Sequence, residues 1–91
     1  MSIKILEFQS QMDNSSNYQQ RTIQCRSWVD YLNSLLCDQK NQIPSPSIPR
    51  NSRIYEILDI SNNHIVCKYK HWKIGWVIHY GFVLPDDDLE P

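Results

Sequence analysis

Hydrophobic and polar residues alternate with a period of two along residues 64–84. The alternating sets are Ile65, Cys67 and Tyr69 against Val66, Lys68 and Lys70, followed by Ile74, Trp76, Ile78 and Tyr80 against Gly75, Val77, His79 and Gly81. This period is typical of β-strands, in which successive side chains point to opposite faces. The segment also holds two of the three tryptophans, both glycines and all three histidines. We therefore expect it to form the centre of the fold, with Trp76 and Phe82 in the core.

Neighbouring residues predict further strands around this centre. The expected strands are residues 53–60, 65–70, 74–80 and 82–84, with a separate short strand at residues 2–8. Ser61, Asn62 and Asn63 favour a turn, because such residues tolerate left-handed backbone angles. Gly81 permits a bulge or a sharp bend before the last strand. Residues 53–84 thus predict an antiparallel β-meander of three or four strands.

A different period appears between residues 18 and 39, where hydrophobic residues recur every three or four positions. They are Cys25, Trp28, Val29, Leu32, Leu35 and Leu36. This spacing predicts one amphipathic helix over residues 18–39. Ser15, Ser16 or Asn17 can supply its N-cap. A lone helix of this length does not persist in water, so we expect its apolar side to rest on the sheet.

Prolines divide the expected helix from the meander. Residues 43–50 contain Pro44, Pro46 and Pro49, a density that neither a helix nor a central strand tolerates. We interpret this segment as a stiff, extended connection. A polyproline ligand is the alternative, although only Pro46 and Pro49 have the P-x-x-P spacing. Residues 85–91 predict an acidic tail.

The order of these elements defines the fold class. We expect one small α+β domain over residues 1–91, with one amphipathic helix packed on a small antiparallel β-meander. Two architectures fit: a partly open SH3-like barrel capped by the helix, or an open sheet with the helix across one face. We favour the barrel slightly, because it leaves fewer exposed strand edges.

Composition narrows the classes of function. The chain has 91 residues, of which 41% are hydrophobic and 11% aromatic, enough for a small globular core. Nine basic and ten acidic residues leave a net charge of −1, which argues against coating nucleic acid or membranes by charge alone. Three cysteines without a C-x-x-C pair predict reduced thiols. Without an apolar leader or a membrane-length run, we expect a cytoplasmic protein with no membrane contact.

No motif in the chain predicts a reaction. His64, Cys67, His71 and His79 carry metal-ligating atoms, but their spacing does not gather four ligands, so we expect no metal and no cofactor. Two glycines cannot build a phosphate-binding loop, and no nucleophile elbow is present. We therefore expect a protein that is not an enzyme.

Cations and aromatic rings gather in one part of the sequence and suggest a binding surface. The candidate partner-binding residues are Tyr69, Trp72, Lys68, Lys70, Lys73, Arg50 and Arg53. We expect a small interaction or regulatory module that binds a protein partner through the meander, and exposed strand edges also permit a homodimer. Single-stranded nucleic acid is the alternative partner, because lysines meet phosphates while rings stack on bases. Tyr69 would point to the face opposite Lys68 and Lys70, which weakens that alternative.

Overall fold

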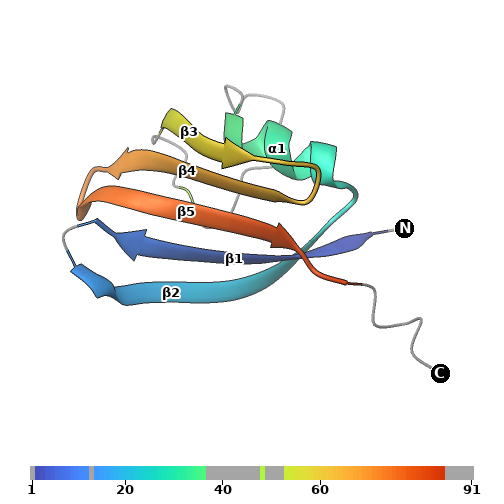
Figure 1. Cartoon of the computed structure of the whole chain (residues 1–91), viewed down its shortest axis with the longest axis horizontal. Coiled ribbons are helices and arrows are strands. Elements are labelled where there is room, and N and C mark those ends of the chain that lie inside the picture. The colour runs from blue at the N-terminus through green and yellow to red at the C-terminus, as the bar shows by residue number, and fades with distance from the viewer. Residues whose placement is uncertain (1, 13, 37–47, 49–52, 86–91) are drawn as a thin grey trace.

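A five-stranded antiparallel sheet and one helix make up the fold (Figure 1). The computed structural model describes residues 2–12, 14–36, 48 and 53–85. Its elements are β1 (Ile3–Gln11), β2 (Asn14–Cys25), α1 (Trp28–Leu36), β3 (Ile54–Ile60), β4 (His64–His71) and β5 (Gly75–Val83). Apart from Ile48, the predicted proline-rich connection, with Arg50, falls outside the described residues, as does the acidic tail beyond Pro85. The α+β class is confirmed.

The strand order in the sheet is β2-β1-β5-β4-β3. A hairpin joins β1 to β2, the meander runs from β3 to β5, and β5 pairs with β1 at the centre. The predicted strand at the N-terminus, the meander and the turn at residues 61–63 are all confirmed. The sheet is open, with β2 and β3 at its edges, and no pairing among the described strands closes it into a barrel. The open-sheet architecture is therefore the one observed.

The helix is much shorter than predicted. Residues 18–25 belong to β2, and α1 begins only at Trp28. In β2, Ile23 and Cys25 pack against the core. Its pairing with β1, from Ile3 opposite Cys25 to Phe8 opposite Gln20, holds this segment in a strand regardless of its helical propensity. The N-cap is Ser27, not a residue upstream of Tyr18.

Ser27 caps α1 through its side chain. Its Oγ accepts a hydrogen bond from the backbone N–H of Asp30 at 3.1 Å, which satisfies one of the donors that a helix leaves unpaired at its start. The chain thus leaves β2 at Cys25 and enters the helix within three residues. This short connection lays α1 across one face of the sheet.

Hydrophobic side chains from α1 and from the sheet, together with Ile48, form one core. Its buried members are Ile5, Tyr31, Leu35, Ile48, Ile65, Tyr69 and Val77. Gly81 lies inside β5 and does not bend it, contrary to our prediction of a bulge. A Cβ atom on Gly81 would lie 2.6 Å from the hydroxyl oxygen of Tyr31 and 2.9 Å from its ring. Glycine is needed here because the Tyr31 ring packs directly on the backbone of β5.

Candidate interaction surface

The two faces of the sheet carry different sets of side chains. Side chains alternate along each strand and directly opposite residues share a face, so the register assigns every position. The buried set, which faces α1, includes Ile5, Glu7, Ile65, Cys67, Tyr69, Val77 and His79. The other set defines the open face: Lys4, Leu6, Phe8, Ser10, His64, Val66, Lys68, Lys70, Trp76, Ile78, Tyr80 and Phe82, with Gln20, Thr22 and Gln24 of the neighbouring strand β2. No described helix or strand covers the open face (Figure 1).

Aromatic rings line the middle of the open face. Phe8 stacks on Tyr80 with ring centroids 4.6 Å apart and an angle of 20° between the planes. Phe82 lies 5.8 Å from Phe8 and 5.9 Å from the ring of His64. These side chains come from β1, β4 and β5, three adjacent strands. Because the rings stack on one another, they form one packed apolar layer.

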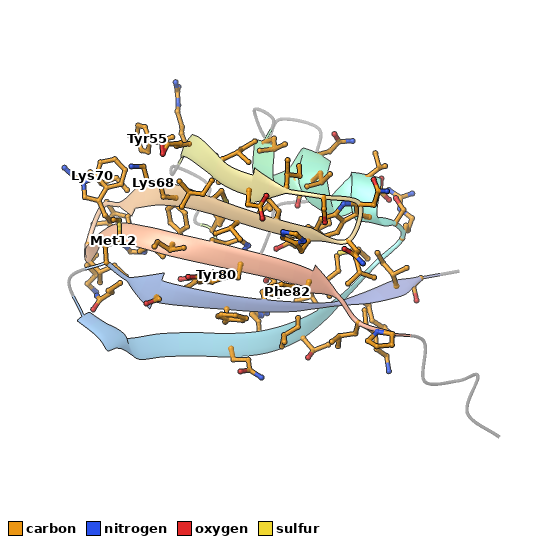
Figure 2. All side chains as sticks on the ribbon, in the orientation of Figure 1. Met12, Tyr55, Lys68, Lys70, Tyr80 and Phe82 are labelled. Atoms are coloured by element: carbon orange, nitrogen blue, oxygen red, sulfur yellow. The ribbon has the colours of Figure 1, made fainter. Side chains whose placement is uncertain are left out.

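Lysines gather at one end of the open face, beside the turn between β4 and β5. The ammonium groups of Lys68 and Lys70 lie 5.4 Å and 5.9 Å from the centroid of the Trp76 ring. Tyr55 meets the same ring edge to face at 5.4 Å. Lys68 also lies 3.6 Å from a carboxylate oxygen of Glu56. Figure 2 shows Tyr55, Lys68 and Lys70 together at this end, which we call the lysine end, with Tyr80 and Phe82 further along β5.

An acidic group marks the opposite end, beside the turn between β3 and β4. Asp59 Oδ2 accepts a hydrogen bond from His64 Nε2 at 2.8 Å, and this bond lowers the pKa of Asp59. His64 Nδ1 lies 2.7 Å from the hydroxyl oxygen of Ser61. Asp59 itself remains largely exposed. This end of the face therefore presents the negative charge of Asp59 to solvent, with Lys4 of β1 exposed on the same face.

The chain Ser61, His64, Asp59 has the residue types of a catalytic triad, which the sequence did not suggest. Ser61 also contacts the side-chain oxygen of Asn63 at 3.2 Å, and its backbone N–H donates to the carbonyl of His64. All these contacts lie within one exposed turn, and none of the described contacts aims backbone donors at a position for an oxyanion. We therefore assign this network to fixing the turn.

The six described members of the predicted partner-binding set separate into four groups. Lys68 and Lys70 lie on the open face, whereas Trp72 and Lys73 lie in the adjoining turn, with the Lys73 ammonium 5.6 Å from the Trp72 ring centroid. Arg53 is exposed just before β3. Tyr69 is fully buried in the core and is removed from the binding set.

The predicted core positions of Trp76 and Phe82 are wrong, because the register places both on the open face. Phe8 and Tyr80 complete the aromatic layer and were absent from the predicted binding set. A signal for this layer was present in the pairing of two predicted strands. Lys68 and Lys70 of residues 65–70 share a face with Trp76 and Tyr80 of residues 74–80 when the two strands pair. Reading that signal requires the register of β4 and β5, which the turn at residues 72–74 sets.

Beneath α1 lies a buried polar cluster of Glu7, Tyr31 and His79. The Tyr31 hydroxyl lies 2.7 Å from His79 Nε2, and His79 Nε2 lies 3.6 Å from Glu7 Oε2. Burial lowers the pKa of His79 to about 4, although Glu7 opposes this shift, so the ring is neutral at pH 7 and the contact is not an ion pair. Burial and Glu7 both raise the pKa of Tyr31.

This cluster is a hydrogen-bonded part of the core. With the hydrogen on Nε2, His79 donates to Tyr31, and Tyr31 in turn donates to Glu7. Among the described residues, His79 Nδ1 has no hydrogen-bond partner. Glu7 and His79 are fully shielded from solvent, so the cluster cannot meet a substrate without opening of the helix. Burial also raises the pKa of the Cys67 thiol to about 12, which removes it as a nucleophile at neutral pH.

Other kinds of site have little support in the described part of the chain. No three His, Cys, Asp or Glu side chains there gather to hold a metal ion. None of the helices described has the length and apolar character needed to cross a membrane. No protein-family model, curated protein or solved structure matches this chain. The open face is thus the candidate surface that the geometry defines.

Proposed function

We propose that this chain is a small, non-enzymatic interaction or regulatory module that binds another protein through the open face of its sheet. One observation carries the proposal: Phe8, Tyr80 and Phe82 form a stacked layer on a face that no described element covers. Contiguous apolar surface of this kind marks interaction sites in small proteins. Aromatic residues are also the side chains that contribute most to protein interfaces.

The way the rings pack favours a protein over a nucleic acid. A base stacks on the exposed flat side of a ring, but the facing sides of Phe8 and Tyr80 are occupied by each other. The charges on the face are also partly balanced, because Lys68 lies beside Glu56. A protein layer with apolar side chains matches such a surface better than a chain of phosphates does.

Site-specific photo-crosslinking tests the proposal. A photoreactive phenylalanine analogue at Tyr80 should form an adduct with a protein when the full chain is irradiated in an extract of its own cells. The matched control places the same analogue at Val29, an apolar residue of α1 that is 62% exposed and lies away from the open face. Adducts from position 80 but not from position 29 support the proposal. Equal labelling, or no labelling from position 80, contradicts it.

Single-stranded nucleic acid is the second candidate, favoured by the two lysines that share the Trp76 ring. Fluorescence anisotropy of labelled single-stranded RNA and DNA, at about 50 and 200 mM salt, tests it directly. Binding that weakens with salt, and that a Trp76→Ala change reduces, would support this candidate. Absence of binding at the lower salt concentration removes it.

We also propose a cytoplasmic location. It is supported by Cys25 and Cys67, which are free thiols in the structure. Reduced cysteines are the rule in the cytosol, whereas secreted proteins of this size depend on disulfides. Fractionation of cells that express the full chain tests the location, and recovery in a secreted fraction would contradict it.

A further inference from the structure

We propose that the protein bound by the open face is a second copy of this chain, so that two sheets pack face to face in a two-fold symmetric dimer. This inference rests on the proposed function, because it names the occupant of the same surface. Three features of the described residues support a second copy: the size of the face, its apolar centre, and the opposite charges at its two ends.

The face has the size that a stable dimer needs. Five strands at the usual spacing span about 24 Å, and strands of seven to nine residues span about 23 to 30 Å, which gives roughly 650 Å². A standard protein interface buries about 800 Å² of accessible surface on each partner, and side chains that project from a sheet add to the flat area. One whole face of this sheet therefore supplies a standard interface.

Charge is arranged to complement itself. Along β5, Lys70 lies level with Trp76, while Asp59 lies level with Val66 and hence with Tyr80. Ile78 is midway between these two levels. The face therefore carries Lys70 and Asp59 at two different levels of β4 and β3, beside the apolar side chains of β5 and β1.

Only one two-fold arrangement matches these ends. An axis at the level of Ile78, in the plane of the interface and perpendicular to the strands, reverses the strand direction of the second copy. Lys70 of each copy then lies close to Asp59 of the other, on the adjoining strand, and Tyr80 of each copy lies level with Trp76 of the other. Lys68 of each copy lies at the level of the axis, opposite Lys68 of the other, and its contact with Glu56 offsets its charge. The result is a two-layer sandwich with both helices outside.

Edge-to-edge pairing of β3 is the competing dimer. β3 exposes Leu58 and Ile60, but its pairing with β4 shifts register twice, between Ile54 and Glu56 and between Ile57 and Asp59. Irregularities of this kind distort the row of backbone groups that another strand would use. The structure therefore favours the face over the edge.

Light scattering coupled to gel filtration tests the dimer with the full chain at about 1 to 300 µM, the range in which weak to moderate dimers dissociate. The expected mass at the upper end is twice the 10.8 kDa of one chain. Tyr80→Lys should raise the dimer Kd at least about 30-fold, as expected for a central residue of an interface. Val29→Lys is the control and should leave the Kd unchanged. Loss of the dimer with Leu58→Lys but not with Tyr80→Lys would overturn the face-to-face arrangement in favour of the edge.

A charge exchange tests the arrangement without touching the apolar centre. Lys70→Glu and Asp59→Lys should each raise the Kd roughly tenfold, because each acts twice in a two-fold dimer, and the double variant should recover most of the loss. Both residues are exposed, so the variants should fold. No recovery in the double variant overturns the proposed register.

Failure of the dimer can be told apart from failure of the proposed function. A monomer at about 300 µM overturns the dimer. If the photoreactive analogue at Tyr80 then labels a different protein, the proposed function stands. If it labels nothing, both proposals fall.

Discussion

On the face of the sheet beneath α1, the carboxyl group of Glu7 and the imidazole of His79 are buried, whereas on the open face stacked rings such as Phe8 and Tyr80 face outward. A half-buried antiparallel sheet normally has apolar residues inside and polar residues outside, and the covered face follows this pattern apart from Glu7 and His79. The covered face tolerates its polar groups because Tyr31 and His79 hydrogen-bond within the core. The open face has no comparable reason to be apolar unless another molecule covers it.

The two faces also differ in what they contribute: the covered face to folding and the open face to binding. The covered face holds the close packing that makes the fold unique, including the contact between Tyr31 and Gly81. The open face has rings that pack only on their neighbours in the same layer. Substitutions on the covered face should therefore change stability, and substitutions on the open face should change association.

The largest effect is expected from Tyr31→Ala, compared with Tyr80→Ala. Tyr31 is fully buried, and removing its ring should lower the free energy of unfolding by about 3 to 5 kcal/mol. Tyr80→Ala should cost about 1 kcal/mol or less, because the ring lies on an uncovered surface. Urea denaturation at about 1 µM protein, where a weak dimer is dissociated, measures both. Similar losses for the two variants would contradict the division between the faces.

The two glycines of β5 provide the next comparison. Gly81→Ala places a methyl group 2.6 Å from Tyr31 and should cost about 1 to 3 kcal/mol, because the buried ring must move. Gly75→Ala has open space around it, but its φ of +87° is unfavourable for alanine, so a loss of about 1 kcal/mol is expected. Thermal unfolding of both variants shows which substitution lowers the stability more. A milder effect at position 81 would show that Tyr31 does not pack on β5 as described.

Acid should weaken the covered face through His79. Its pKa is lowered to about 4 in the fold from an ordinary 6.5, so the unfolded chain binds the extra proton first as the pH falls. The stability linked to the neutral ring is complete above pH 6.5 and is lost as the pH falls toward 4, with a slope of up to about 1.4 kcal/mol per pH unit. His79→Gln should flatten this dependence in urea titrations between pH 7 and 4.5. His64→Gln, a partly exposed control, should retain it; an unchanged slope in His79→Gln would assign the dependence to other groups.

The sequence predicted the meander well, because alternation along residues 64–84 is a local signal that the final register preserves. It could not predict which alternating set would be buried. Val77, His79 and Gly81 face the core rather than Trp76, Ile78 and Tyr80, and at position 81 only glycine leaves room for the Tyr31 ring. The fit between the side chains of α1 and β5 decides which face of β5 is buried. The alternation of residues along one sequence does not contain this information.

Residues 18–25 show a second limit of the sequence. The hydrophobic spacing that begins at Cys25 predicts a helix over residues 18–39, but pairing with β1 makes residues 18–25 a strand. Of the predicted binding set, Lys68 and Lys70 were placed together by alternation alone. Their aromatic neighbour Trp76 comes from the next strand and could be found only from the register.

The smallest effect on stability is expected from Trp72→Ala, although its effect on binding should be clear. Trp72 is 70% exposed in the turn beside the lysine end and packs mainly on His71 and Lys73. Its removal should change the free energy of unfolding by no more than about 0.5 kcal/mol. Trp28→Ala is the matched control, because Trp28 stacks on Tyr31 at 5.3 Å and should cost well over 1 kcal/mol.

Trp72→Ala should also weaken photo-crosslinking from position 80 if the partner reaches past the face onto the turn. Calorimetry and crosslinking on the same protein separate the two effects. Reduced crosslinking with an unchanged unfolding transition would extend the interaction surface from the open face to residues 72–74. Unchanged crosslinking would confine the interaction surface to the stacked rings and the two lysines. If Trp72 touched the partner, its removal would lower the crosslinking yield.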